Sequence, residues 1–353
     1  MARSIRERVL VTSREQTLLT VVVPCHNSSD YMDHCVQSLL VGAADVEIIV
    51  VDDGSTQDDT PAKADAWAVN YPETVAVIHQ ANTGYGGAVM AGLQAARGTY
   101  FYVVDSDDWV DGDAFSVLLT TLRRLANAGP APDLVVVNYV SEHVNAGTRR
   151  TASFDGALPK NRLFTWDGVR VFRPWQKMLL HALVYRTGLL RDADLVVPHH
   201  TYYVDNILSY VPLPLVKTAY YLPVDLYRYF IGRSDQSVNP QVMLSRLDQQ
   251  FRVTGLLIDA VKLPEGAGSP KLARYMRSYL AMMVAVTAVL ALADGSPEAL
   301  EGRRRLREHV DATDPTLWRQ LGPLAWVTNL PGSWSGPIVR GGYELARRAY
   351  RFN

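Results

Sequence analysis

Residues 100–111 read YFYVVDSDDWVD, an apolar run that ends abruptly in carboxylates. The run Tyr100 to Val104 has the β-branched and aromatic composition of a buried strand, and Asp105, Asp107 and Asp108 follow it directly. Carboxylates this close repel one another. A bound Mg²⁺ or Mn²⁺ offsets that repulsion most simply, because oxygen ligands suit these ions. The alternative is a polar turn after a strand, or a helix N-cap at Asp108.

Similar apolar runs recur through the first half of the chain and predict a sheet. The strands are expected at residues 20–23, 46–51, 75–78, 100–104 and 133–140, with helices between them at 31–40, 62–70, 88–96 and 113–127. Such alternation predicts βαβ units and a doubly wound, mostly parallel α/β sheet. Ligands bind such sheets at the carboxyl ends of the strands, which is where the acidic clusters fall.

Composition and net charge limit the classes of protein to which this chain can belong. The 353 residues suffice for one large domain or two modest ones, and 48% of them are hydrophobic. The formal net charge of -1 gives no overall basic footprint, so nucleic acid is not an expected partner. The first 17 residues are mixed and charged, without the apolar centre of a secretory signal.

The two cysteines bear on the cellular compartment of the protein, and its most apolar run bears on whether it crosses a membrane. Cys25 and Cys35 do not make a disulfide framework, so a reducing cytoplasm fits and both are expected to be packing residues. The most apolar run, Tyr279 to Ala293, is shorter than the roughly 20 residues that a spanning helix needs. It predicts a buried helix, with peripheral membrane contact as the alternative.

Each of two loop motifs allows a ligand-binding interpretation and a purely structural one. DDGST, residues 52–56, offers a carboxylate for a base or ribose, but the same residues form common turns. NTGYGGA, residues 82–88, opens a helix with small residues that either admit a phosphate or allow tight helix–strand packing. It matches neither the P-loop nor the Rossmann spacing.

Two further segments lie in the middle of the chain. Asp205 in YYVDNILSYVPL is either a helix N-cap or a general base. The loop YRYFIGRSDQSV carries Arg233 and Ser237, which suit a diphosphate or form a solvated loop.

Together these pieces resemble the GT-A nucleotide-binding half of the inverting family-2 glycosyltransferases. The resemblance lies in TVVVPCHNSSDYMDHCVQSLL, IIVVDDGSTQDDT and NTGYGGAVMAGLQAARGTYFYVVDSDDWV, over residues 18–115, and continues more loosely to 240. It implies a GT-A catalytic domain over residues 1–240, with a nucleotide-binding half (18–115) and an acceptor half (116–240). From 241 to 353 the sequence pattern itself predicts a helical region, with helices at 241–261, 270–293 and 297–310.

The resemblance also implies roles for single residues. Pro24 and Asp53 would contact the nucleotide base, Asp105 would face the ribose or the metal, and Asp107 would ligate the divalent cation. Asp205 occupies the position of the family's catalytic base. The remaining donor-site residues would be His26, Asn27, Asn82, Gly84, Gly87 and Ser106, with Arg233 and Ser237 placed where related wall-teichoic-acid and capsule enzymes hold the diphosphate.

The expected reaction follows from this resemblance. A sugar would pass with inversion from a UDP-sugar to a hydroxyl of a bacterial cell-surface glycan or a lipid-linked acceptor, with Mn²⁺ or Mg²⁺ as cofactor. Two departures bear on this: Val204 replaces the usual acid before the base, and GYGGA is similar to polyprenyl-phosphate sugar synthases. The alternatives are therefore a polyprenyl-phosphate glycosyl synthase or a non-catalytic nucleotide-sugar-binding domain. The sequence does not decide between a monomer and a homo-oligomer.

The last residues suggest a surface role. YELARRAYRF, residues 343–352, interleaves aromatic and apolar side chains with arginines. Such a segment can lie on anionic lipid at the inner face of a membrane or contact a lipid-linked acceptor. The alternative is a docked terminal helix with solvated arginines.

Overall fold

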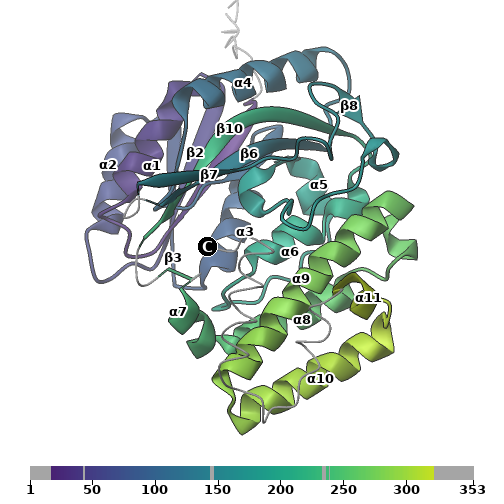
Figure 1. Cartoon of the computed structure of the whole chain (residues 1–353). Helices are drawn as coiled ribbons and strands as arrows, with labels where there is room; N and C mark the ends of the chain where they lie inside the picture. Colours follow the sequence, from purple (N-terminus) through teal and green to yellow (C-terminus); the bar gives the residue numbers. More distant parts are fainter. Residues whose placement is uncertain (1–16, 43, 144–146, 233–235, 238, 322–353) are drawn as a thin grey trace, which may run out of the picture.

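The computed structural model describes residues 17–42, 44–143, 147–232, 236–237 and 239–321. A sheet lies in the upper half of the molecule, and the helices of the C-terminal region gather below it (Figure 1). The expected fold class is confirmed: a mixed α/β fold with a mostly parallel sheet, followed by a helical region.

The sheet has the strand order β3-β2-β1-β4-β9-β6-β10-β5, with β7 paired to β6 and β8 to β10. Its strands are β1 (Leu19–Cys25), β2 (Val46–Asp53), β3 (Val75–Gln80), β4 (Tyr100–Val103), β5 (Trp109–Val110), β6 (Leu134–His143), β7 (Thr148–Ala152), β8 (Leu163–Phe164), β9 (Leu183–Arg186) and β10 (Ala219–Ile231). The first four are parallel, as expected. The fifth expected strand, β6, does not pair with β4, because the antiparallel β9 lies between them.

The helices of the sheet domain cover both of its faces. They are α1 (Met32–Leu39), α2 (Thr60–Asn70), α3 (Tyr85–Ala95), α4 (Gly112–Asn127), α5 (Thr187–Asp192) and α6 (Asp205–Tyr210). The short 3-10 turns are η1 (Leu40–Gly42), η3 (Trp166–Gly168), η4 (Leu180–Ala182), η5 (Leu213–Leu215) and η6 (Glu265–Ala267). Right-handed crossovers place α1 and α2 on one face and α3 on the other, because the chain reverses its direction across the sheet after β3.

This reversal fixes where a ligand can bind. Strands β2 and β3 extend the sheet on one side of β1, and β4 lies on its other side. The carboxyl ends of β1 and β4 therefore form the topological switch point, which is the usual ligand position in such folds.

The structure agrees with the sequence-based expectation for the two cysteines and differs slightly at the start of α2. Cys25 and Cys35 are free and buried, which confirms them as packing residues. Helix α2 begins at Thr60, two residues before the expected start at 62, and Asp59 holds its N-cap position. The Thr60 hydroxyl accepts a hydrogen bond from the Ser28 amide at 2.7 Å, which attaches α2 to the loop after β1.

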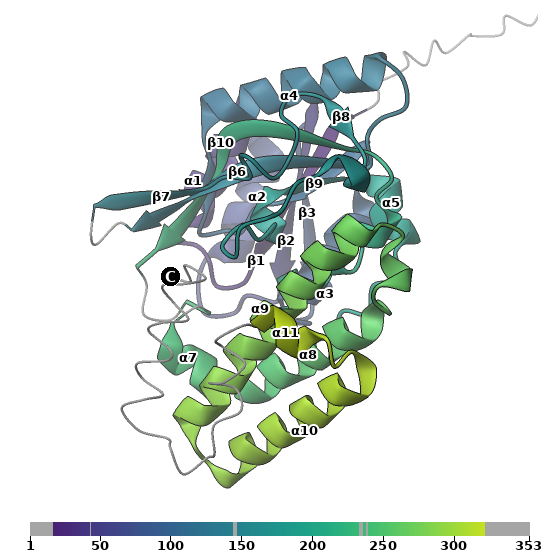
Figure 2. The ribbon, with the colours of Figure 1, turned by 45° about the vertical axis from the view of Figure 1, so that its right-hand side comes forward.

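The C-terminal region contains α7 (Pro240–Ser245), α8 (Leu247–Ala260), α9 (Pro270–Asp294), α10 (Pro297–Thr313) and α11 (Leu317–Leu321). Both views show these helices together below the sheet (Figures 1 and 2). The single helix expected from Gln241 to Val261 is wrong. Arg246 has φ -124° and ψ 27°, which is not helical, and it separates α7 from α8.

Helix α9 is the apolar helix expected from the sequence. By length and composition alone it could cross a membrane, with a mean hydropathy of 1.7, yet 78% of that window is buried inside the fold. The Met178 amide donates to its Tyr275 hydroxyl at 2.8 Å. Its burial confirms the packed-helix interpretation. The apolar core is continuous between α9 and the sheet, and the domain division at residue 240 stays a prediction.

Candidate functional site

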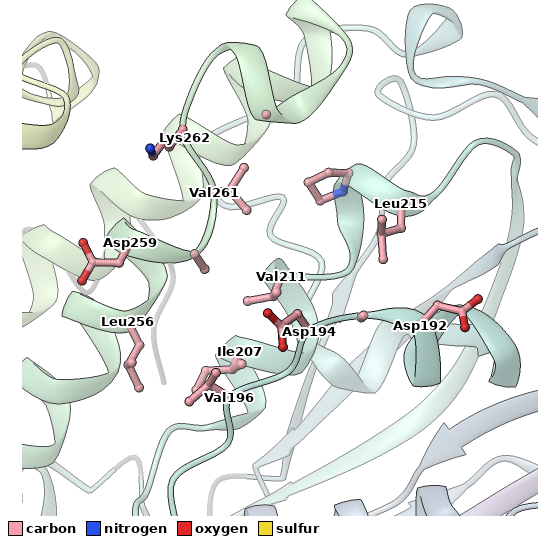
Figure 3. Close-up of a pocket in the computed structure, with 14 residues that line it drawn as sticks. Asp192, Asp194, Val196, Ile207, Val211, Leu215, Leu256, Asp259, Val261 and Lys262 are labelled. Atoms are coloured by element: carbon pink, nitrogen blue, oxygen red, sulfur yellow. The ribbon is translucent and has the colours of Figure 1, made fainter.

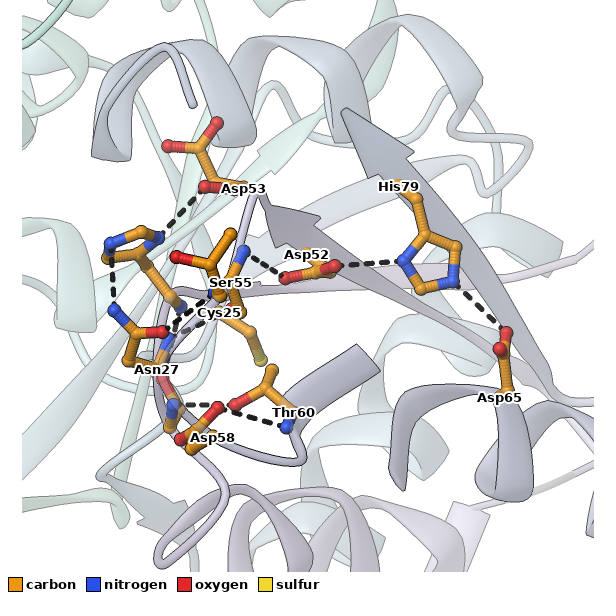
Figure 4. Close-up of polar contacts among 12 residues, drawn as sticks. Cys25, Asn27, Asp52, Asp53, Ser55, Asp58, Thr60, Asp65 and His79 are labelled. Atoms are coloured by element: carbon orange, nitrogen blue, oxygen red, sulfur yellow. Dashed lines mark hydrogen bonds and ion pairs between the residues drawn. The ribbon is translucent and has the colours of Figure 1, made fainter. Parts of the chain in front are cut away.

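The loops that follow β1, β2, β3 and β4 are joined by hydrogen bonds at the switch point. Figure 4 shows the contacts between the loops after β1 and β2. One His26 ring nitrogen lies 2.9 Å from the Asp53 carbonyl, and the Asn82 amide nitrogen lies 3.2 Å from the same ring. The Ser106 hydroxyl after β4 donates to the Ser28 hydroxyl at 2.9 Å. The structure thus brings the expected donor-site residues of four different loops together.

Asn27 holds the loops after β1 and β2 in register. Its amide donates to the Ser55 hydroxyl at 2.9 Å, and its side-chain oxygen accepts from the amides of Thr56 and Gln57. Its φ of 49° is left-handed, a conformation that asparagine tolerates better than most residues. Pro24 is the second-last residue of β1 and is buried beside this loop. Base contact by Pro24 and Asp53 stays a prediction.

The two carboxylates at the end of β2 have separate structural partners. Asp53 accepts from the amides of Thr83 (2.9 Å) and Gly84 (2.8 Å) and from the Gln80 side chain (2.7 Å). Asp52 accepts from the Ser55 amide and lies 2.9 Å from His79 (Figure 4). Asp53 therefore fixes the shape of the glycine-rich loop, which the sequence does not reveal.

The glycines of this loop allow backbone segments to approach closely. A Cβ on Gly84 would lie 2.8 Å from the His200 amide nitrogen, and one on Gly86 would lie 2.3 Å from Val197. A Cβ on Gly87 would lie 2.1 Å from the Thr83 hydroxyl. The segment that leads to Asp205 thus packs on the glycine-rich loop. Donor contacts of Gly84 and Gly87 stay predictions.

Replacing Gly84 with Ala is expected to destabilise the fold. Its φ of 84° and ψ of 168° are accessible essentially to glycine alone. Such strain costs about 1–3 kcal/mol for other residues, before the contact with His200 is counted. Chemical denaturation should show this loss, whereas Gly112→Ala in α4, whose Cβ would have 3.5 Å of room, should change stability by less than about 1 kcal/mol. Equal stability of the two variants would contradict this account of the loop.

The acidic cluster after β4 is more buried than the sequence suggests. Asp108 is 1% exposed, and its two oxygens accept from the Phe230 amide at 2.7 Å and from the Tyr227 hydroxyl. Asp105 accepts from the Tyr85 hydroxyl at 2.9 Å. Among the described residues, neither carboxylate pairs with a lysine or arginine.

Burial and mutual repulsion change the acidity of this cluster. Desolvation, and then the charge of Asp107, raise the pKa of Asp105 to about 7, while the Tyr85 hydrogen bond opposes the shift. Desolvation also raises the pKa of Asp108, with further contributions from Asp107 and Asp105. A divalent cation would favour the charged forms of these groups, so the cluster fits a metal ion.

His181 joins this cluster, although the sequence assigns it no role. One ligand atom each from Asp105, Asp108 and His181 lie within 4.8 Å of one another. The ring of His181 lies 4.3 Å from that of Tyr227, and desolvation lowers its pKa to about 4, which keeps it neutral. The two carboxylates suit Mn²⁺ or Mg²⁺, whereas imidazole is the more usual ligand of Zn, Cu, Fe and Ni. No sequence signal identifies His181, because it comes from an irregular segment.

Asp107, the expected metal ligand, lies in the same turn but outside this group of three. Its side chain is partly exposed, whereas Asp108 is buried. Its charge contributes to the raised pKa of both Asp105 and Asp108, so it lies near both carboxylates. Metal ligation by Asp107 stays a prediction.

Asp205, the expected base, begins α6 and belongs to the same site. Desolvation raises its pKa to about 6, against hydrogen bonds from Asn206 and its own amide. The charge of Asp205 contributes to the raised pKa values of Asp105, Tyr85 and Tyr229. These contributions indicate that the charge of Asp205 lies near the acidic cluster. Val204 holds the N-cap position of α6, so the N-cap interpretation of Asp205 is wrong, and its role as a base stays a prediction.

The C-terminal helical region supports the position of Asp205. The Tyr279 hydroxyl in α9 donates to the Asn206 side-chain oxygen at 2.7 Å, and the Asn206 side-chain nitrogen donates to the Tyr203 carbonyl at 2.9 Å. Helix α9 therefore orients the first turn of α6 through Asn206.

The loop after β10 is described only in part. The Ser237 carbonyl accepts from the Tyr203 hydroxyl at 3.3 Å, which places Ser237 beside the Asp205 segment. Arg233 lies outside the described residues, as does the segment 343–352. Diphosphate binding by Arg233 and Ser237 stays a prediction.

A separate cavity of about 570 Å³ lies on another side of α6 (Figure 3). Its lining combines apolar side chains such as Ile207 and Val211 with Asp194, Asp259 and Lys262. Ile207 follows Asp205 by two positions, about 200° around the helix, so this cavity faces away from the carboxylate. It is not part of the site described above.

Comparison with known sequences gives consistent matches. Residues 20–180 match the family model described as Glycosyl transferase family 2. Glycosyltransferase EpsH of Bacillus subtilis is 30% identical over 232 residues, which are 61% of this chain and 64% of EpsH. Uncharacterized glycosyltransferase EpsJ of the same organism is 39% identical over 193 residues, 50% of this chain and 52% of EpsJ. The chain thus spans less than two thirds of either relative.

Comparison with solved structures supports the fold. S. aureus TarS 1-349 superimposes with a TM-score of 0.62 at 16% identity, covering 95% of this chain and 89% of that one. Its complex with UDP-GlcNAc gives a TM-score of 0.61 at 17% identity, with the same coverage. At such identities the likeness confirms the fold class alone.

Proposed function

We propose that this chain is a family-2 glycosyltransferase that transfers a sugar, with inversion, from a UDP-sugar to a hydroxyl acceptor. The observation that carries the proposal is that the acidic turn after β4 lies close enough to Asp205 for the charge of Asp205 to contribute to the raised pKa of Asp105. The TarS complex with UDP-GlcNAc supports a UDP-sugar as the donor.

The acidic turn is the proposed metal site. Asp107 with Asp105 would hold Mn²⁺ or Mg²⁺, and Asp108 and His181 are close enough to take part. When bound, such an ion neutralises the negative charge that develops on a leaving diphosphate. The chain's own contribution is to bury and orient these carboxylates through Tyr85, Tyr227 and the Phe230 amide.

Asp205 is the proposed general base. A carboxylate with a pKa of about 6 is ionised at neutral pH and is more basic than an ordinary aspartate. It would accept the proton of the acceptor hydroxyl as that oxygen bonds to the anomeric carbon and the nucleoside diphosphate leaves. Attack from the face opposite the leaving group inverts the anomeric centre. The acceptor would be a cell-surface glycan or a lipid-linked saccharide.

The polyprenyl-phosphate alternative rested on the sequence GYGGA. Close packing against residues 197–204 already accounts for the glycines at 84 and 86, so this motif gives no specific support for a lipid phosphate acceptor. The hydroxyl acceptor is therefore preferred.

A panel of nucleotide sugars tests the proposal directly. A UDP-sugar with Mn²⁺ at about 100 times its Kd should stabilise the protein by about 2.7 kcal/mol, which is visible as a higher Tm. GDP-, CDP- and dTDP-sugars serve as matched controls for the base. Release of UDP in the presence of acceptor extracts then tests transfer. If no nucleotide sugar raises the Tm, the proposed donor class is wrong.

A further inference from the structure

Arg246, between α7 and α8, has an unusual environment for a cation. Its guanidinium carbon lies 3.4 Å from the centroid of the Tyr202 ring, so one face of the group is covered. The terminal nitrogen Nη1 is shielded from solvent and has no hydrogen-bond partner within the described ranges. Native proteins rarely leave a buried donor unsatisfied, and a charged donor is especially costly to bury in this way.

Tyr203 places this cation beside the proposed base. The pKa of Tyr203 is raised to about 12, first by desolvation, while the charge of Arg246 opposes the shift and that of Asp205 adds to it. Both charged groups therefore lie near the same phenol. The hydroxyl of Tyr203 also donates to the Ser237 carbonyl. Arg246 thus lies at the edge of the site where Asp205 and the loop after β10 meet.

The surrounding backbone is held in place without Arg246. The Tyr202 amide donates to the Gln249 side-chain oxygen at 2.8 Å, and Arg252 donates to the Thr201 hydroxyl at 3.2 Å. Tyr203 keeps a φ of 68°, a strained conformation that is often found at binding sites. Arg252 attaches α8 to this segment by a hydrogen bond, so the unpaired Nη1 of Arg246 is not needed for that purpose.

We propose that Arg246 binds phosphate oxygens of a substrate at the Asp205 side of the site. A planar guanidinium whose face is fixed on an aromatic ring presents its edge to an anion, and phosphate matches its donors. The phosphate belongs either to the donor diphosphate or to the acceptor. This inference extends the proposed function and rests on it for the identity of the substrate.

Anion titrations of matched variants test this role. Wild type, Arg246→Gln and Arg252→Gln would be titrated with inorganic phosphate and, separately, with UDP, in metal-free buffer at constant ionic strength. Arg246→Gln should weaken the binding of at least one anion about tenfold or more, whereas Arg252→Gln should stay within about twofold of wild type. Weakened UDP binding identifies the donor diphosphate, and weakened phosphate binding alone identifies a phosphate on the acceptor.

A structural role for Arg246 predicts a lower melting temperature for ligand-free Arg246→Gln. Under the binding proposal that temperature should equal or exceed the wild-type value, because the substitution removes a cation whose Nη1 is shielded and unpaired. Affinities within twofold of wild type for both anions would overturn the proposal, whatever the melting temperature. If the Gln variant does not fold, Arg246→Lys keeps the charge without the planar fork and should show about a fivefold loss; affinities equal to wild type would overturn the proposal. Failure of the proposed transfer activity would appear separately, as wild-type protein that binds phosphate but releases no UDP.

Discussion

Replacing Asp205 with Asn is expected to lower the rate of sugar transfer by about 10²-fold or more, the typical contribution of a general base. The amide keeps the size of the side chain but cannot accept a proton. The Kd for the UDP-sugar should change by less than about threefold, because the carboxylate acts on the acceptor. Asp194→Asn is a matched control: it changes an exposed aspartate of the preceding segment.

The pH dependence of transfer provides an independent measurement. Burial raises the pKa of Asp205 to about 6, so the wild-type base is increasingly protonated, and inactive, below that pH. The rate should therefore fall about tenfold per pH unit below pH 6 and level off above it. The residual activity of Asp205→Asn should lack this acidic limb. A variant with nearly wild-type turnover and an unchanged pH profile would place the base elsewhere.

The carboxyl ends of the first four strands could be predicted because the relevant rules are local. Short β-branched runs alternate with helical segments, and parallel strands place their carboxyl ends at one edge. Asp53, Asp105 and Asp107 were therefore expected at one edge, as the structure shows. The residues alone also predicted a metal site at the acidic turn, whereas the separate roles of Asp53, Asp105 and Asp107 came from the resemblance.

Other parts of the site depend on contacts between distant segments. Strand β9 has four residues and lies antiparallel between β4 and β6, a placement that no local pattern specifies. His181 precedes β9 and so reaches the acidic cluster through the same insertion. Arg246 interrupts a sequence with continuous helical character. The role of the glycines in residues 82–88 could not be predicted for another reason. A bound phosphate and a closely packed backbone segment both require a residue without a Cβ at these positions.

Replacing Asp107 with Ala is expected to abolish transfer, with a loss of at least about 10³-fold. A divalent ion contributes several kcal/mol to the stabilisation of a leaving diphosphate, and each 1.36 kcal/mol is a factor of ten in rate. EDTA should have the same effect on wild type, and added Mn²⁺ or Mg²⁺ should restore it. Asp113→Ala, an exposed aspartate in the first turn of α4, should keep nearly full activity. Full wild-type activity in a chelator would refute the metal role.

Direct Mn²⁺ binding, measured by electron paramagnetic resonance, can show which carboxylates hold the ion. Both oxygens of Asp108 already accept hydrogen bonds, and the ring of His181 packs against Tyr227 and Tyr229. Asp108 and His181 must give up these contacts to bind a metal, and Asp107 is more exposed than Asp108. Asp107→Ala should therefore weaken Mn²⁺ binding by at least about tenfold, and His181→Asn by less. The reverse order would place the ion among Asp105, Asp108 and His181 and would make Asp107 a residue that acts only through its charge.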